Sequence, residues 1–97
     1  MTQWTITRDH LAEPDAPAGT NLNAAGVVGP RAATLTAAQI ADHPRAVRFR
    51  MRDDDGGLCY GGALVGDDLF APLDQFGMPN AGCTSVEVLT GRRWERV

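Results

Sequence analysis

The sequence predicts an α+β fold in which β-structure predominates: a small twisted antiparallel sheet of about five strands with one short helix. Three observations support this expectation. Residues 46–66 alternate apolar and polar side chains on both sides of a glycine-rich turn, which indicates a β-hairpin. Shorter alternating stretches lie near each end of the chain, and one stretch before the hairpin carries helix-start signals. With 97 residues we expect a single domain over 1–97, and its sheet could curl toward a barrel.

The hairpin over residues 46–66 is the element around which we expect the rest of the chain to pack. Its turn lies at Asp55-Gly56, which places Met51 opposite Tyr60, or at Gly56-Gly57, which places Met51 opposite Gly62. The two registers differ by an even step, so each side chain keeps its face in either case. The predicted core face is Val47, Phe49, Met51, Leu58, Tyr60 and Leu64. The opposite face carries Arg48, Arg50 and Arg52 beside Cys59, Gly61, Ala63 and Val65.

The chain before the hairpin is expected to hold a strand, a long irregular segment and the helix. Trp4 and Ile6 alternate with threonines over residues 4–7, which predicts a short strand. The segment 8–33 lacks periodicity, and its part 8–23 is a loop of a length that is usually either functional or disordered. Both interpretations stay open. Val27-Val28 either forms a brief edge strand or fills the core.

The one helix is predicted near residues 36–43. Thr36 suits the N-cap position, and Gln39 lies three residues later, as a capping box requires. Leu35 and Ile40 are placed for a hydrophobic staple, and Pro44 ends the helix. A helix of about two turns is unstable alone in water, so it must dock its apolar side on the sheet. His43 would then lie in the last turn, at the negative end of the helix dipole.

After the hairpin, residues 67–83 form a loop that is irregular but apolar. Phe70, Leu73, Phe76 and Met78 are too many large apolar side chains for a solvated loop. The loop therefore either covers the core as a lid or presents a recognition surface, and both alternatives remain. Residues 84–89 and 92–97 then read as two strands joined by a turn at Thr90-Gly91.

Composition limits the class of protein. Twelve acidic residues exceed nine basic ones, all of them arginine, and the net charge of −3 argues against bulk binding to nucleic acid while leaving a local basic strip possible. The first residues show no signal-peptide pattern, and no apolar run approaches the ~20 residues of a membrane span. We therefore expect a soluble, cytoplasmic protein. Cys59 and Cys83 are then expected to be reduced, although a disulfide between them stays an alternative.

Motifs for catalysis and metal binding are lacking in the sequence. Asp53-Asp54-Asp55-Gly56 lacks the alternating carboxylates and the distant glutamate of a calcium loop, so it reads as a turn. The candidate soft ligands are His10, His43, Cys59 and Cys83, and none has a zinc-site spacing. The sole serine, Ser85, has no nucleophile elbow around it. We expect no enzyme, no cofactor and no catalytic or metal-binding residue.

Several stretches together carry a resemblance. They are WTITRDH, GVVGPR, LTAAQI, FRMRDDDG, Tyr60 with Gly62, FAPLDQFGMPNAGC and a closing RWE. In this pattern, which covers nearly the whole chain, the sequence resembles short uncharacterised proteins encoded in actinobacterial genomes and their plasmids or phages. The resemblance implies no activity, and no functional residue carries over from it.

Two binding hypotheses follow. The first is a non-enzymatic accessory protein that binds another protein, or a second copy of itself, through Phe70, Phe76 and Met78. The alternative is weak nucleic-acid binding through Arg48, Arg50 and Arg52, which repeat about every 6.6 Å along one strand face. Those arginines could equally pair with acidic residues on a solvated face, and no aromatic side chain is expected among them. A small enzyme or metal protein is the least favoured reading.

Overall fold

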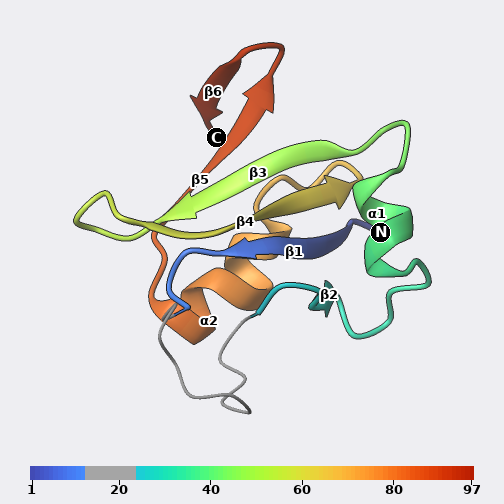
Figure 1. Ribbon diagram of the computed structural model, residues 1–97, viewed down its shortest axis with the longest axis horizontal. Helices are drawn as coiled ribbons and strands as arrows, with labels where there is room; N and C mark the ends of the chain where they lie inside the picture. The colour runs from blue at the N-terminus through green and yellow to red at the C-terminus, as the bar shows by residue number, and fades with distance from the viewer. Residues whose placement is uncertain (13–23) are drawn as a thin grey trace.

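The computed structural model describes residues 1–12 and 24–97. These residues form one antiparallel sheet of six strands in the order β2-β1-β4-β3-β5-β6 (Figure 1). The strands are β1 Gln3–Asp9, β2 Val28–Gly29, β3 Val47–Arg52, β4 Leu58–Val65, β5 Ser85–Thr90 and β6 Arg93–Arg96. The mainly-β prediction is confirmed. The sheet has one strand more than expected and stays open, with β2 and β6 at its edges, so the barrel alternative is wrong.

The additional strand comes from the segment that was expected to be irregular. Val28–Gly29 pairs with β1, so the edge-strand alternative holds for this part of the chain. Gly29 faces the Trp4 ring so closely that a Cβ atom there would overlap it. β1 itself continues past residue 7 to Asp9, with a bulge between Ile6 and Arg8. Most of the predicted loop 8–23 lies outside the described residues.

The hairpin adopts the first of the two predicted registers. Val47 pairs with Leu64, Phe49 with Gly62 and Met51 with Tyr60. A bulge then pairs Arg52 with Leu58, which the sequence pattern did not predict. One extra residue reverses the alternation of faces, so Leu58 lies on the arginine side and Cys59 packs in the core beside Tyr60.

The turn of the hairpin is organised by the side chain of Asp53. Its Oδ1 accepts hydrogen bonds from the backbone N–H groups of Asp55 and Gly57, at 3.0 and 2.9 Å. Gly56 has a φ of +82°, which favours glycine, and its carbonyl accepts from Nη1 of Arg52. The aspartate run therefore acts as a turn former, as predicted.

The helix α1, Ala37–Ala41, starts as the sequence predicted. The Thr36 hydroxyl accepts from the Gln39 N–H at 3.2 Å, and the Gln39 side chain accepts from the Thr36 N–H at 2.8 Å. Ile40 is fully buried, and α1 contacts β1 and β4. The helix ends earlier than expected, at the Asp42 C-cap. His43 therefore lies outside it, and its Nδ1 accepts from the Arg45 N–H.

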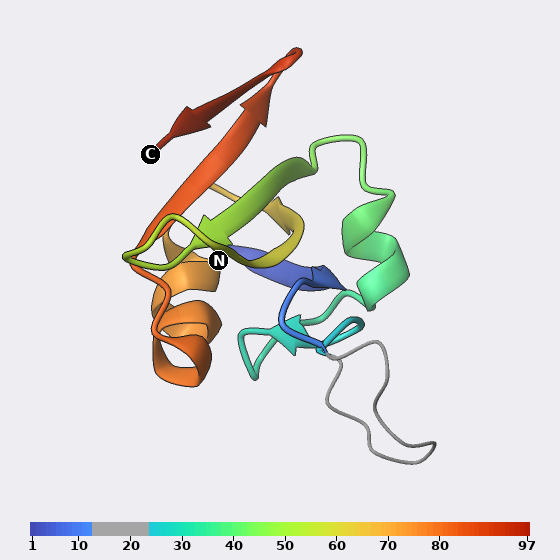
Figure 2. The same ribbon diagram turned by 60° about the vertical axis from the view of Figure 1, so that its left-hand side comes forward.

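The apolar loop after the hairpin is helical, which corrects the prediction of an irregular segment. Residues 71–81 form a helical cover that contains the π-helix η1, Leu73–Gly77, and the helix α2, Met78–Ala81. Pro72 lies in its first turn, where its missing N–H costs nothing, and Gly82 caps it with a φ of +67°. Figure 2 shows this cover on one side of the sheet and α1 on the other.

The main core lies between the sheet and the helical cover. Its buried members are Trp4, Ile6, Phe49, Met51, Cys59, Tyr60, Leu64, Ala71, Leu73, Cys83, Val86 and Val88. Ala71, Leu73 and Cys83 are buried in this core, as expected of a lid, whereas Phe70 and Met78 are exposed, so the alternative of a recognition surface stays open for these two residues. Among the helices described, none has the length and apolar character needed to cross a membrane.

Candidate functional site

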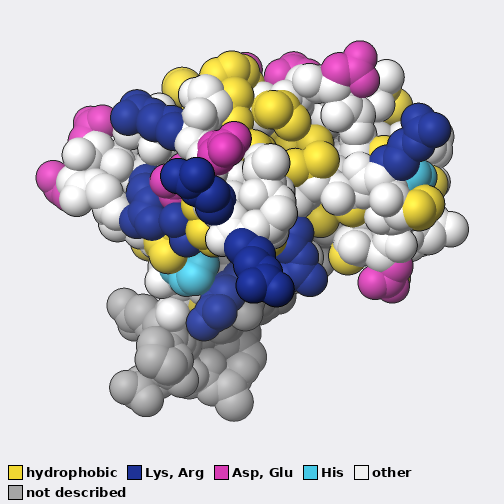
Figure 3. All heavy atoms as spheres, turned by 90° about the horizontal axis from the view of Figure 1, so that it is seen from above, with side chains coloured by type: hydrophobic (Ala, Val, Ile, Leu, Met, Phe, Trp, Pro, Cys, Tyr) yellow, Lys and Arg dark blue, Asp and Glu magenta, His cyan; other side chains and the backbone are white. Residues whose placement is uncertain are grey.

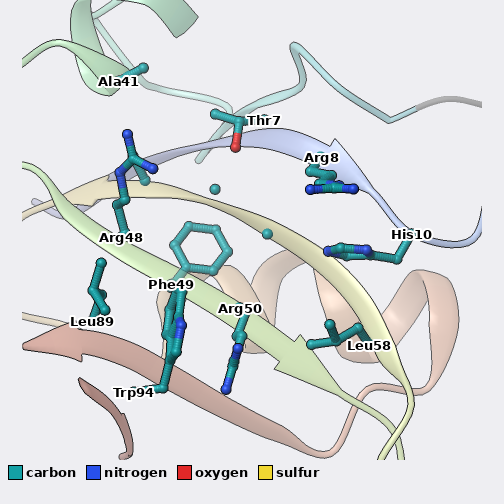
Figure 4. A pocket seen from close by; sticks show the side chains of 13 residues that line it. Thr7, Arg8, His10, Ala41, Arg48, Phe49, Arg50, Leu58, Leu89 and Trp94 are labelled. Atoms are coloured by element: carbon teal, nitrogen blue, oxygen red, sulfur yellow. The ribbon is translucent and has the colours of Figure 1, made fainter. Parts of the chain in front are cut away.

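The face of the sheet opposite the core carries a pocket of about 420 Å³. We call this side the arginine face, because Arg48, Arg50 and Arg52 lie on it. Figure 3 shows dark-blue arginine side chains gathered beside a cyan histidine. Figure 4 shows that the lining side chains come from β1, α1, β3, β4 and the β5–β6 hairpin. The lining residues are Thr7, Arg8, His10, Ala41, Arg48, Phe49, Arg50, Leu58, Gly61, Gly62, Ala63, Leu89 and Trp94.

The strand register explains why cations converge on this pocket. Arg8 and Arg50 are both paired with Gly61, from the two strands that flank β4. Neighbouring strands are about 4.8 Å apart, so these two arginines start about 10 Å apart, with no side chain between them. Nε2 of His10 lies 3.9 Å from the position that a Cβ atom on Gly61 would take. Gly61 thus leaves a gap in the side-chain layer, with Arg8 and His10 beside it and with Arg50 starting on its other side and leaning toward Glu87.

Two of the three predicted arginines share one carboxylate. Glu87 on β5 accepts from Nε of Arg50 at 2.6 Å and from Nε of Arg52 at 2.9 Å. The guanidinium carbon of Arg50 also lies 4.3 Å from the ring centroid of Trp94, a cation–π contact. The predicted pairing with acidic residues therefore holds for Arg50 and Arg52.

The aromatic contact corrects another expectation, that no aromatic side chain lies on this face. Trp94 pairs with Leu89 across the β5–β6 hairpin, and both residues line the pocket. The alternation of residues 84–97 around Gly91 could have placed Trp94 there. That inference required the face of β5 to be known first, and β5 is aligned by its pairing with β3.

The remaining cations of the pocket are not neutralised by neighbours. Arg8 and Arg48 have exposed side chains and form no ion pair with any residue in 1–12 or 24–97. Arg8 was not singled out from the sequence, because β1 was expected to end at Thr7. Its charge and that of Arg48 give the pocket a local positive potential in a chain with a net charge of −3.

The ionisable groups of this face respond to their surroundings. Partial burial, together with the charge of Arg8, lowers the pKa of His10 from its ordinary 6.5, and Asp9 opposes this change. Burial of the Glu87 carboxyl raises its pKa, but the hydrogen bonds and charges of Arg50 and Arg52 outweigh burial, so the net pKa lies below 4.5. Near neutral pH, His10 is therefore a neutral hydrogen-bonding group and Glu87 a carboxylate.

The apolar candidates lie on the other side of the sheet. Phe70 and Met78 are exposed, at 44% and 51% of their surface. Phe76 is half-buried, with its ring centroid 5.5 Å from that of Trp4 and 5.0 Å from that of Tyr60. The structure thus separates the three residues into one core contact and two exposed side chains, and it brings none of them to the arginine face.

The other reactive groups do not meet in a site. Cys59 and Cys83 are buried free thiols, and burial, together with a hydrogen bond to Cys59, raises the pKa of Cys83 to about 12. Such a thiol is protonated at neutral pH and is a poor nucleophile. Within the described part of the chain, no group of three or more His, Cys, Asp or Glu residues is placed to hold a metal ion. The chemistry that the arginine-face pocket offers is attraction and orientation of an anion.

Comparison of the chain with protein-family models, with curated proteins and with solved structures gave no match.

Proposed function

We propose that this protein is a small non-enzymatic accessory protein that binds single-stranded nucleic acid on the arginine face. The observation that carries the proposal is the pocket lined by Arg8, Arg48, Arg50 and Trp94, in which the guanidinium of Arg50 lies over the Trp94 ring. Binders of single strands combine positive charge that follows the backbone with aromatic or guanidinium planes on which bases stack. This pocket offers both features within one small area.

The charge distribution favours a weak, salt-dependent interaction. Arg50 and Arg52 are partly neutralised by Glu87, whereas Arg8 and Arg48 form no ion pair with the residues that the structure describes. Two or three phosphate contacts to a single strand give a slope of roughly −1.4 to −2.1 in log affinity against log salt. We therefore expect binding that is measurable at low salt and largely lost at high salt.

Fluorescence anisotropy with a labelled oligothymidylate, titrated at several salt concentrations, tests this proposal. Arg48→Ala should weaken binding about fivefold and reduce the salt slope by about 0.7, because one phosphate contact is lost. Arg31→Ala is the matched control, since Arg31 is exposed and lies outside the pocket. Equal weakening by both variants, or binding that ignores salt, would contradict the assignment to this face.

A second candidate function is protein binding through the helical cover, favoured by the exposure of Phe70 and Met78. A pull-down from nuclease-treated lysate would test it, with bound proteins identified by mass spectrometry. A partner that survives nuclease treatment, and is lost with Phe70→Ser or Met78→Ser, would support this function. Partners that vanish with nuclease treatment would instead support the nucleic-acid proposal.

A further inference from the structure

We propose that the gap over Gly61 is a subsite for a terminal phosphate monoester, so that the protein prefers the phosphorylated end of a strand to its interior. This inference rests on the proposed function, because it names which part of a nucleic-acid strand the same face selects. It starts from one cross-strand row of the sheet, in which Arg8, Gly61 and Arg50 lie side by side on β1, β4 and β3.

The geometry of that row forms a cradle. Arg8 on β1 borders the gap over Gly61 from one side, whereas Arg50 on β3 starts on the other side and leans away from it, toward Glu87 on β5 and the Trp94 ring. Nε2 of His10 lies over the same glycine. The floor is backbone already paired to strands on both sides, so the hydrogen-bond donors available to a ligand are the guanidinium and imidazole groups around the rim.

The charge of the cradle matches a monoester better than an internal phosphate. A terminal phosphate carries about −1.5 to −2 at pH 7 and three strong acceptor oxygens, whereas an internal phosphodiester carries one negative charge. The cationic guanidinium of Arg8, together with the imidazole of His10, favours the ligand with more charge and more acceptors. The lining of the pocket, which includes Ala41, Leu58 and His10, also favours a monoester. A terminal phosphate is joined to its strand by one ester bond, whereas an internal phosphate needs space for the strand on both sides.

Gly61 provides a variant that alters the subsite and leaves the fold intact. A Cβ atom at this position would lie 3.5 Å from the Phe49 carbonyl oxygen and 3.9 Å from Nε2 of His10, both ordinary contact distances. Gly61→Ala therefore fits the sheet and projects a methyl group into the proposed phosphate position. Circular dichroism of the variant confirms that it is folded before binding is measured.

The experiment compares two oligothymidylates of about ten nucleotides, labelled at the 3′ end, one with a 5′-phosphate and one with a 5′-hydroxyl. Anisotropy is measured near pH 8, where the monoester, with a second pKa of about 6, is a dianion. We expect the wild-type protein to bind the phosphorylated strand about tenfold more tightly. In Gly61→Ala the affinity for the phosphorylated strand should fall to that for the hydroxyl strand, so that the preference disappears.

The possible outcomes separate this inference from the function on which it rests. Equal affinity of the wild type for both strands would overturn the subsite and leave the proposed function standing. No binding of either strand at low salt would overturn the proposed function itself. Thymidine 5′-monophosphate serves as a third ligand, and affinity equal to that of the phosphorylated strand would overturn the preference for a strand end in favour of a mononucleotide.

Discussion

The two faces of the sheet are built from the same strands and end in opposite surfaces. On the core face, Tyr60 and Leu64 of β4 are buried under the helical cover. On the arginine face, the middle of β4 presents only Gly61 and Ala63, so that no large side chain of β4 covers this part of the sheet. The helix α1, whose Ile40 is fully buried, contacts β1 and β4, and its last residue, Ala41, lines the pocket. Small residues in one strand can thus allow a helix to pack against a sheet and leave a pocket beside it.

The largest difference between the two faces is expected when a methyl group is added to each of the neighbouring glycines, Gly61 and Gly62. A Cβ atom at Gly62 would overlap the Thr5 carbonyl oxygen on β1, which cannot move without disrupting strand pairing. We expect Gly62→Ala to lower the free energy of unfolding by about 3 kcal/mol or more, and Gly61→Ala by less than about 1 kcal/mol. Urea denaturation followed by tryptophan fluorescence measures both. Equal losses would contradict the difference that we assign to the two positions.

Substitutions of two phenylalanines in residues 67–83 test the packing on the core face. Phe76→Ala removes ring contacts with Trp4 and Tyr60, so we expect a loss of about 2–3 kcal/mol in the free energy of unfolding. Phe70→Ala removes an exposed ring and should cost less than about 0.5 kcal/mol. Thermal unfolding of the two variants would show the order. A larger loss for Phe70→Ala would contradict the packing of the cover described above.

The smallest loss of stability is expected for a substitution on the arginine face that should also change the affinity for oligonucleotides. Glu87→Gln removes the carboxylate shared by Arg50 and Arg52, both partly exposed, so we expect a loss of about 1 kcal/mol in the free energy of unfolding. The same change frees two cations, so oligonucleotide affinity should rise severalfold. A variant with lower stability and unchanged affinity would show that the freed arginines do not face the ligand.

The pH dependence of stability tests separately whether the charge of Glu87 stabilises the fold. Its pKa in the folded protein lies below the ordinary value of 4.5, so its contribution is complete above pH 4.5 and is lost as the pH falls through the folded value. Denaturation of the wild type and of Glu87→Gln at a series of acidic pH values should converge as the pH decreases. Curves that stay parallel would assign the stabilisation to something other than the charge of Glu87.

The sequence was sufficient for features governed by local rules. The capping box depends only on Thr36 and Gln39, which are three residues apart in the sequence. The turn residues around Gly56 allow two hairpin registers, and both registers place the same side chains on the same faces. The helical start and the pairing of Met51 with Tyr60 were therefore predictable.

Features that depend on distant contacts were not predictable in the same way. The bulge that turns Cys59 inward has no sequence signature here, because it depends on how β3 and β4 pair near the turn. The helical cover contains Pro72, Gly77 and Pro79, which argued against a helix until its packing on the core was known. The site was partly predictable: Arg48 and Arg50 were found by alternation, whereas Arg8, His10 and Trp94 join them only through the sheet.

Arg50 illustrates a last consequence, which concerns entropy. A free arginine loses up to about 2 kcal/mol of rotamer freedom when a ligand fixes its side chain. Arg50 has already given up much of that freedom, because Glu87 holds its Nε and Trp94 supports its guanidinium plane. Arg8 and Arg48 have no such support among the residues described, so a ligand must order them itself. The pocket thus combines one preorganised donor with two adaptable ones, which allows ligands of different shape to use the same fixed point of contact.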